Sequence, residues 1–458
     1  MPDRHNVVLV LADQHRAGAT GPAGNPDVHT PALDRLAAEG TRCTGAYANV
    51  PVCTPSRASV LTGRYPQSTG VIANDLALAP EERTLGEAFR DAGYRTAYVG
   101  KWHLDGVPRD GPTPPERRHG FGFWAAFNCT HQYVDAPYYR DGELRRHEWG
   151  PAGETDLALE FLDGEEPFFL VVAYGPPHAP YDQVPGRYRE RYDPDGLAVP
   201  PNAEPIPGGE GTLGPVHEPR ELLADYYAQV TAVDDQVGRL LEGLDARGLA
   251  DDTAVAYTSD HGDMLCSQGL QKKETPHEES VGVPWLVRGP GVPAGETIDA
   301  PLGLLDLAPT LCGLSDADPD LPAEGTDRAP LLRGDPDADR PESVPIMLPA
   351  TADQSLAQGL PVWRGVRTER YTYARLADGT PWLLFDNRGD PHQLRNLALD
   401  ADHREVRERL DGLTDAWLED VGDPFLETRE QIRHAGAVET WNRRERELPF
   451  VDEPRVID

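Results

Sequence analysis

Short apolar runs that alternate with helical patterns constrain the fold of this chain more than any other feature. The apolar runs have the length of strands and span 7–12, 95–99, 168–173 and 253–258. The segments with helical patterns between them span 31–40, 85–93, 155–162 and 221–247. Continuously apolar strands that alternate with helices predict a mostly parallel sheet with helices on both faces, which is the α/β class.

The pattern changes in the second half of the chain. Residues 182–220 are rich in Pro and Gly and predict a surface excursion, and residues 315–345 have the Pro, Asp and Gly content of a linker. Short alternating runs then predict an antiparallel meander at 362–368, 371–376 and 382–386. A charged helix is expected near residues 402–421, and the polar C-terminal end, from about residue 429, is expected to wrap loosely.

These patterns predict two structural units. We expect a catalytic domain at residues 1–340 and a smaller C-terminal α+β subdomain with an antiparallel sheet at residues 341–458. A chain of 458 residues has room for both units and for a sizeable core in the larger one.

Charge and cysteine content restrict the partners and the compartment. A formal net charge of −34 should repel nucleic acid and anionic membranes, so a small anion can bind only in a local cationic pocket. Five scattered cysteines are not a disulfide framework. The apolar run at 6–12 is too short to span a membrane and lacks the cleavage site of a signal peptide. We expect a cytoplasmic protein without nucleic-acid or membrane partners, and a homo-oligomer is allowed.

Polar motifs directly follow four of the predicted strands. They are Asp13-Gln14, Lys101-Trp-His103, Pro177-His178 and Ser259-Asp-His-Gly-Asp263. In an open parallel sheet, ligands bind in the crevice outside the carboxyl ends of the strands, so these side chains should converge on one site. Lys101 strengthens the inference because the chain has only two other lysines, Lys272 and Lys273.

Part of this set has the composition of a metal site. Two carboxylates, an amide oxygen and an imidazole favour Ca²⁺, Mg²⁺ or Mn²⁺ over zinc. The candidate ligands are Asp13, Gln14, Asp260 and His261. Structural roles are the alternative: an N-cap for Asp13, a core position for His103, a loop position for His178 and a solvated turn for the lysine pair. Their joint occurrence at strand ends favours the site.

Cys53 begins a segment, Cys-Thr-Pro-Ser-Arg57, that reads as the start of a helix. Thr54 is suited to the N-cap, Pro55 to the first helical position and Gly63 to the C-terminal stop. Cys53 would lie at the mouth of this helix, where free N–H groups favour an anion, and it could be a thiolate nucleophile of low pKa. Metals that prefer oxygen ligands do not suit a soft thiolate, so an oxygen nucleophile is more coherent.

The same segment, followed by Leu61-Thr-Gly-Arg64, resembles the signature of the formylglycine-dependent sulfatases of the alkaline-phosphatase superfamily. In that family the cysteine of C-x-P-S-R becomes Cα-formylglycine, and its hydrated aldehyde, a gem-diol, is the nucleophile. The strand-end motifs also match family landmarks in order, and the match runs from about residue 5 to 400. Further matching segments are 278–284, 288–291, 365–373, 384–386, 390–391 and 396–397. The resemblance implies an alkaline-phosphatase-like sheet sandwiched by helices and a small-molecule sulfate ester as substrate.

The resemblance implies roles for the metal ligands and for the nucleophile. One divalent metal would be held by the modified cysteine and four further residues, which are Asp13, Gln14, Cys53, Asp260 and His261. Arg57 would steady the formylglycine. Ca²⁺ is expected first, with Mn²⁺ or Mg²⁺ as alternatives. A formylglycine-generating enzyme would be the partner for maturation.

Other matched positions would contact the substrate. Lys101 would bind sulfate, and His103 would be the base for the gem-diol. His178 and Lys273, which fits the family spacing better than Lys272, would bind sulfate and protonate the leaving oxygen. Asn74 matches a substrate-contacting Asn of some members. His131 either lines the substrate pocket or has a core or surface position.

Two motifs depart from the commonest family pattern. Many sulfatases have Asp-Asp after the first strand and Asp-Asn at the last metal motif, where this chain has Asp13-Gln14 and Asp260-His261. The variant resembles choline sulfatases and phosphonate monoester hydrolases. A phosphonate monoester or phosphodiester hydrolase on the same scaffold is therefore the alternative function, and a catalytically silent binding scaffold is a third possibility.

Overall fold

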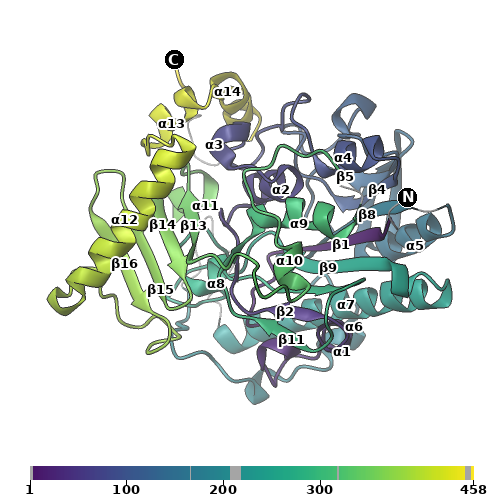
Figure 1. The fold of residues 1–458 in the computed structure, drawn as a ribbon, viewed down its shortest axis with the longest axis horizontal. Coiled ribbons are helices and arrows are strands. Elements are labelled where there is room, and N and C mark those ends of the chain that lie inside the picture. Colours follow the sequence, from purple (N-terminus) through teal and green to yellow (C-terminus); the bar gives the residue numbers. More distant parts are fainter. Residues whose placement is uncertain (1–3, 166, 207–217, 317–318, 449–454) are drawn as a thin grey trace.

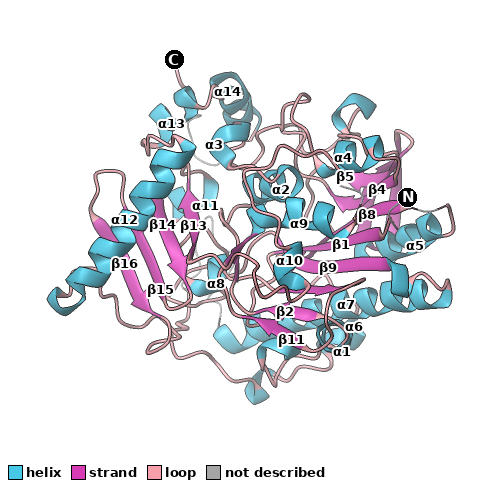
Figure 2. Ribbon diagram, in the orientation of Figure 1, coloured by secondary structure: helices cyan, strands magenta, loops and turns pink. Residues whose placement is uncertain are grey.

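A ten-stranded mixed sheet organises most of the chain in the computed structural model, which describes residues 4–165, 167–206, 218–316, 319–448 and 455–458 (Figures 1 and 2). From edge to edge its strands are β11 (Glu296–Ile298), β2 (Thr41–Cys43), β10 (Trp285–Arg288), β9 (Thr253–Ser259), β1 (Asn6–Asp13), β8 (Phe168–Pro177), β4 (Arg95–Lys101), β5 (Phe123–Phe127), β6 (Val134–Arg140) and β7 (Glu143–Trp149). The central strands β9, β1, β8, β4 and β5 are parallel, whereas β10, β6 and β7 are antiparallel to their neighbours. The predicted mostly parallel sheet is confirmed.

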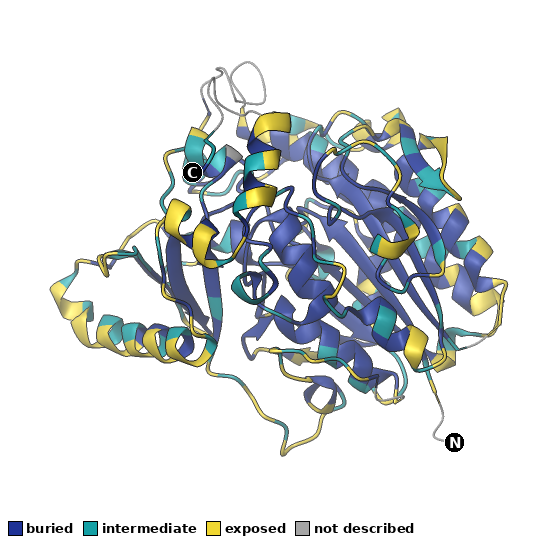
Figure 3. Cartoon of the chain, turned by 90° about the horizontal axis from the view of Figure 1, so that it is seen from above, coloured by how far each residue is buried: buried dark blue, intermediate teal, exposed yellow. Residues whose placement is uncertain are grey.

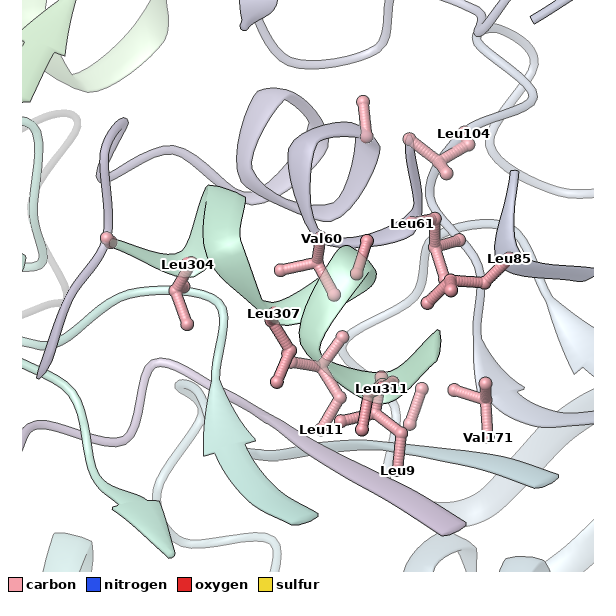
Figure 4. Packing of buried hydrophobic residues seen from close by; sticks show 14 of the residues in the cluster. Leu9, Leu11, Val60, Leu61, Leu85, Leu104, Val171, Leu304, Leu307 and Leu311 are labelled. Atoms are coloured by element: carbon pink, nitrogen blue, oxygen red, sulfur yellow. The ribbon is translucent and has the colours of Figure 1, made fainter. Parts of the chain in front are cut away.

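Helices cover both faces because the central strands are apolar on both sides. In β1, Leu9 and Leu11 belong to one core cluster, while Val8 and Val10 belong to the cluster on the opposite face. Figure 4 shows Leu9 and Leu11 beside Leu311. The first face carries α2 (Cys53–Thr62), α4 (Leu85–Asp91), α9 (Leu307–Leu314) and α10 (Ala329–Leu332). The second carries α1 (Pro31–Ala38), α5 (Gly150–Leu162) and α7 (Pro219–Ala246).

A separate four-stranded antiparallel sheet lies beside the large sheet (Figure 1). Its strands are β13 (Ser343–Leu348), β14 (Trp363–Thr368), β15 (Tyr371–Arg375) and β16 (Pro381–Asp386). Helix α12 (Arg404–Val421) packs on this sheet through Leu410 and Trp417. The opposite side of α12 is exposed, and Figure 3 shows exposed residues on the outer sides of the helices at the margin of the molecule. The predicted meander and charged helix are confirmed, and β13 was not predicted. The domain boundary at residue 340 stays a prediction.

Short elements complete the two units. Helices α3 (Pro66–Thr69), α6 (Gly186–Arg189), α8 (Glu278–Val281) and α11 (Asp353–Ala357) are single turns, and β3 (Ala46–Tyr47) pairs with β12 (Leu302–Gly303). Helices α13 (Thr428–His434) and α14 (Val438–Glu447) end the fold. No described helix combines the length and the apolar character that crossing a bilayer requires.

Three predicted loop regions are more ordered than expected. Residues 182–206 contain α6 and bury Tyr188 and Ile206, while 207–217 lie outside the described residues. The predicted linker contains α10, which buries Leu332 in the main core, although 317 and 318 are not described. The expectation of a loose C-terminal end is wrong for the described part: Trp441 and Ile457 are buried in the core of the large unit, and only 449–454 fall outside the description.

Candidate active site

The four predicted motifs meet at the carboxyl ends of β1, β4, β8 and β9. Asp13, Lys101, Pro177 and Ser259 are the terminal residues of these strands. The ligand atoms of Asp13, Cys53, Asp260 and His261 all lie within 4.8 Å of one another, and all four side chains are buried. Residues that are up to about 250 positions apart in the sequence therefore lie together, as expected for the carboxyl ends of neighbouring parallel strands.

Asp260 connects the strand ends of β1 and β9. Its Oδ1 accepts a hydrogen bond from the backbone N–H of Gln14 at 3.0 Å, and its Oδ2 accepts one from Arg57 Nε at 2.9 Å. Gln14 has a left-handed backbone with φ of 68°. Its side chain donates to Asp263 Oδ2 at 2.6 Å, which fixes the amide so that Oε1 points toward Lys273 Nζ, 2.8 Å away.

His261 presents Nε2 to the centre of the site. Its Nδ1 lies 2.9 Å from the carbonyl oxygen of Gly262 and must carry the proton, because a carbonyl can only accept. Nε2 then lies 3.6 Å from Oδ1 of both Asp13 and Asp260 and 3.2 Å from Cys53 Sγ. A backbone carbonyl that fixes the tautomer in this way is typical of metal-binding histidines.

The donor set fits a divalent metal. Asp13, Asp260, Gln14 Oε1 and His261 Nε2 offer oxygen and nitrogen atoms to one buried point. Two buried carboxylates this close repel each other, and their charge is offset by cations: Lys101 Nζ contacts Asp13 Oδ2, and Arg57 pairs with Asp260. Burial opposes ionisation of Asp13, yet Lys101, His178, Arg57 and His261 together hold its pKa well below the usual value. Carboxylate and amide oxygens gathered at one point suit a hard cation.

Helix α2 begins at Cys53, two residues earlier than its sequence suggests. Val52 is the N-cap, and the predicted capping role of Thr54 is wrong: its Oγ1 accepts a hydrogen bond from Asp75 N at 3.1 Å instead. Gly63 does end the helix in the left-handed conformation, with φ of 66°. Cys53 thus occupies the first helical position, which keeps its side chain close to the free N–H groups of the first turn.

The surroundings of Cys53 are strongly cationic. Burial and the Asp13 carboxylate both oppose ionisation of the thiol, but Lys273, Lys101 and His261 outweigh them and lower the pKa of Cys53 well below its ordinary value. Lys273 Nζ lies 3.3 Å from Cys53 Sγ. This low pKa favours the thiolate form of the encoded residue, and the same cations would favour negative charge on a nucleophile at position 53.

Arg57 connects the helix to two strands. Nε binds Asp260, Nη1 donates to the carbonyl oxygen of Lys101 at 2.9 Å, and Nη2 lies 3.6 Å from Asp13 Oδ2. This Nη2 is buried and makes no hydrogen bond among the residues that the structure describes. Arg64, by contrast, pairs with Glu82 away from the site.

Of the two neighbouring lysines, the structure places Lys273, and not Lys272, in the site. Lys273 is 1% exposed and reaches Gln14 and Cys53, whereas the neighbouring Lys272 is partly exposed. Lys101 is fully buried at the end of β4, and the Asp13 carboxylate and Cys53 raise its pKa despite burial. Both ammonium groups are charged and face the same centre.

His103 belongs to a polar cluster that the sequence analysis did not identify. Its Nε2 lies 3.1 Å from Asp75 Oδ1, and Arg109 binds the same carboxylate through Nε and Nη2 at 2.8 and 2.7 Å. The ligand atoms of Asp75, His103 and Cys129 lie within 4.8 Å of one another. Although burial opposes protonation, Cys129 and Asp75 raise the pKa of His103 to about 10. No periodicity marks Asp75; its position beside Asn74 was the only available signal.

His178 and His131 form a stacked pair. Their ring centroids lie 4.4 Å apart with an interplanar angle of 5°. Nδ1 of His178 donates to the carbonyl of Ala179 at 2.7 Å, which leaves Nε2 as an acceptor in the neutral ring. Burial and Lys273 lower the pKa of His178 well below its ordinary value. His131 is partly exposed, so the pair reaches from the buried centre toward solvent.

Asn74 has a structural contact in addition to its predicted substrate role. Its Oδ1 accepts a hydrogen bond from the backbone N–H of Thr54 at 3.0 Å, in the first turn of α2, and its carbonyl oxygen accepts one from Arg444 Nε at 3.1 Å. Asn74 therefore supports the helix that carries Cys53, and contact with substrate stays a prediction.

Comparison with known proteins identifies the family. The sulfatase family model matches residues 5–317, and a model of the C-terminal part of N-sulphoglucosamine sulphohydrolase matches residues 267–416. An ulvan-active sulfatase of Formosa agariphila is 39% identical over 93% of this chain and 83% of its own length. An endo-4-O-sulfatase of Bacteroides thetaiotaomicron is 32% identical over 92% of this chain and 93% of its own.

Comparison with solved structures supports the same assignment. A structure described under the metabolism of multiple glycosaminoglycans by Bacteroides thetaiotaomicron has a TM-score of 0.83 at 31% identity, covering 94% of this chain and 99% of that one. The phosphonate monoester hydrolase of Agrobacterium radiobacter is more distant, with a TM-score of 0.73 at 24% identity over 92% and 96% of the two chains, and shares the fold. The chain belongs to the formylglycine-dependent sulfatases of the alkaline-phosphatase superfamily, and it is a sulfuric ester hydrolase.

Proposed function

We propose that this enzyme hydrolyses sulfate monoesters with Cα-formylglycine, formed from Cys53, beside one divalent metal. The supporting observation is the setting of Cys53 Sγ, which lies 3.2 Å from His261 Nε2, 3.3 Å from Lys273 Nζ and 3.8 Å from Asp13 Oδ1. An imidazole, an ammonium group and a carboxylate are groups that bind oxygen atoms or hard cations, whereas the Cys53 sulfur that they surround is a soft atom. Arg57 Nη2 supplies a buried donor that an added oxygen would satisfy.

Asp13, Gln14, Asp260 and His261 would hold the metal, Ca²⁺ in the first instance, which supplies positive charge for the nucleophile and for sulfate. The formylglycine supplies a gem-diol, whose one oxygen displaces the alcohol and whose second hydroxyl allows sulfate to be expelled. The charged groups Lys101 and Lys273 would neutralise the sulfate oxygens. Lys273 would protonate the departing oxygen, because the lowered pKa of His178 leaves that ring neutral. His103, in its neutral form, would accept the proton of the second hydroxyl.

The alcohol part of the substrate is proposed to be a saccharide. Two relatives that cover most of the chain are named for ulvan and for an endo-acting 4-O-sulfatase activity. The phosphonate monoester alternative has weaker support, because the hydrolase of that activity is similar in fold at lower identity. We also propose a cytoplasmic location, supported by the five scattered cysteines, whose number and spacing are not those of a disulfide framework.

Two measurements test the proposal. Purified enzyme matured in a host with a formylglycine-generating enzyme should cleave aryl sulfates and sulfated oligosaccharides with a higher kcat/KM than aryl phosphodiesters or phosphonate monoesters. Mass spectrometry of the tryptic peptide from Cys43 to Arg57 should show an aldehyde in place of the Cys53 thiol. Active enzyme with an intact thiol, or a preference for phosphorus esters, would refute it.

A further inference from the structure

The loop that carries Lys273 into the site has an unusual backbone. Residues in the left-handed region occur five times between 265 and 274 at positions other than glycine: Leu265, Cys266, Gln268, Lys272 and Glu274. Lys272 and Glu274, with φ of 61° and 78°, flank Lys273 directly. A left-handed conformation is unfavourable for such residues and persists only where other contacts impose it.

Contacts from the C-terminal subdomain impose it at Glu274. Glu274 Oε2 accepts a hydrogen bond from the backbone N–H of Ser355 in α11 at 2.8 Å. The carbonyl oxygen of Glu274 accepts another from Trp363 Nε1 in β14 at 3.0 Å. Glu274, Ser355 and Trp363 are all buried, so water does not compete for these bonds.

The same subdomain holds the loop at two further points. Gln268 Nε2 donates to the carbonyl oxygens of His392 and Gln393, both at 3.1 Å. The backbone N–H of Gln271 donates to Gln358 Oε1 at 3.2 Å. Residues 268, 271 and 274 are thus attached to segments that lie outside the large sheet, while Lys273, between them, points the other way into the site.

We propose that the C-terminal subdomain positions Lys273 for the reaction through Glu274 and Trp363. The inference rests on the proposed function, in which Lys273 Nζ gives a proton to the departing oxygen while the ester S–O bond breaks, the new S–O bond forms to the nucleophile at position 53, and Lys273 regains its proton from solvent. Glu274 and Trp363 are positioning residues: they touch neither substrate nor metal, and they hold the backbone from which the ammonium extends.

Leaving-group dependence separates positioning from general damage to the fold. An acidic nitrophenol leaves without help, whereas phenol or an alkyl alcohol needs the proton, so misplacing Lys273 matters most for poor leaving groups. The experiment measures kcat/KM over a series of aryl and alkyl sulfates for the wild type, Lys273→Ala, Glu274→Ala, Glu274→Gln and Trp363→Phe. Trp382→Phe, in β16 of the same subdomain, is the matched control.

Lys273→Ala should lose activity increasingly as the leaving group becomes more basic. Glu274→Ala and Trp363→Phe should show the same trend, with a loss of about 100-fold on alkyl sulfates and a much smaller one on nitrophenyl sulfate. Glu274→Gln keeps an acceptor for Ser355 N–H and should recover most of the loss. Equal losses on all substrates, or none, in both Glu274→Ala and Trp363→Phe would overturn the proposal, as would a Lys273→Ala enzyme without the trend. A wild type inactive on every sulfate would instead refute the proposed function.

Discussion

His103 Nε2 lies 3.1 Å from Asp75 Oδ1, and Arg109 donates hydrogen bonds to both oxygens of the same carboxylate. The imidazole therefore has one fixed orientation in a buried setting. Replacing Asp75 by Asn keeps the size of the side chain but removes its charge. We expect Asp75→Asn to lower kcat about 100-fold, with a smaller change in KM, because His103 loses both its orientation and its counter-charge. Steady-state kinetics on an aryl sulfate measure this.

Asp105 provides the control for that prediction. It pairs with Arg117 in the loop after β4, and its carboxylate forms no ion pair with His103 among the described residues. Asp105→Asn should leave kcat within a few-fold of the wild type. An Asp75→Asn enzyme with unchanged kcat would show that the orientation of His103 does not matter.

Cys53→Ser tests the need for an aldehyde. A serine hydroxyl can attack sulfur, but it has no second hydroxyl to expel the sulfate, so turnover should stop after one sulfate transfer. We expect multiple-turnover activity to fall by at least about 100-fold and intact-protein mass spectrometry to find a sulfated serine. Sustained turnover by this variant, at the wild-type rate, would contradict the mechanism.

Chelation tests the metal site. The carboxylates of Asp13 and Asp260 are fully buried, and a bound cation stabilises the folded state by mass action. Removing it should abolish activity and lower the free energy of unfolding by about 2.7 kcal/mol relative to enzyme with metal at 100 times its Kd. Adding back Ca²⁺, Mn²⁺ and Mg²⁺ separately, with calorimetry and activity as readouts, ranks the ions. Full activity in metal-free enzyme would exclude the proposed cofactor.

The buried carboxyl group of Asp234, which lies away from the active site, predicts that the free energy of unfolding depends on pH. It accepts hydrogen bonds from the backbone N–H groups of Ala32 and Leu33 at 2.9 and 2.8 Å, at the start of α1. Burial nevertheless outweighs these bonds and raises its pKa to about 7. A raised carboxyl pKa stabilises the folded state at low pH, and that stabilisation is lost as pH rises from about 4 to about 7, by roughly 4 kcal/mol.

Urea unfolding between pH 4 and pH 8 tests whether the stability falls as the pH rises. The difference in unfolding free energy between the wild type and Asp234→Asn should decrease as pH rises and level off above pH 7. A difference for Asp234→Asn that is flat with pH would mean that the native carboxyl titrates normally.

The convergence of the strand-end motifs could be predicted because it depends only on where each strand ends and on the parallel order of the strands. Apolar strands end at polar residues, and parallel strands place those ends at one edge, so the sequence alone brings Asp13, Lys101, His178 and Asp260 together. The resemblance of the segment at Cys53 supplied the chemistry that spacing alone left open between sulfur and oxygen.

Features that depend on long-range packing were missed. Asp75 follows no period, and its partner His103 lies 28 residues further along the chain, beyond α4 and β4. The hairpin of β6 and β7 is an exposed edge, whose mixed polar sequence lacks clear alternation. Six of the ten residues of helix α14 are charged, so its composition did not indicate that the buried indole of Trp441 attaches it to the core. Thr54 was misassigned because a threonine at the N-cap and a threonine at the second helical position look alike in sequence.

The burial of Trp441 and Ile457 in the core of the large unit has a consequence for inheritance. A C-terminal segment that contributed only to its own subdomain could be exchanged between related genes by recombination. Here the segment completes the same core as Leu61 of α2, the helix that begins at Cys53. The coding segments for α2 and for residues 441–457 should therefore be inherited as a pair, and chimeras that join them from different sulfatases should fail unless the contacting residues are exchanged together.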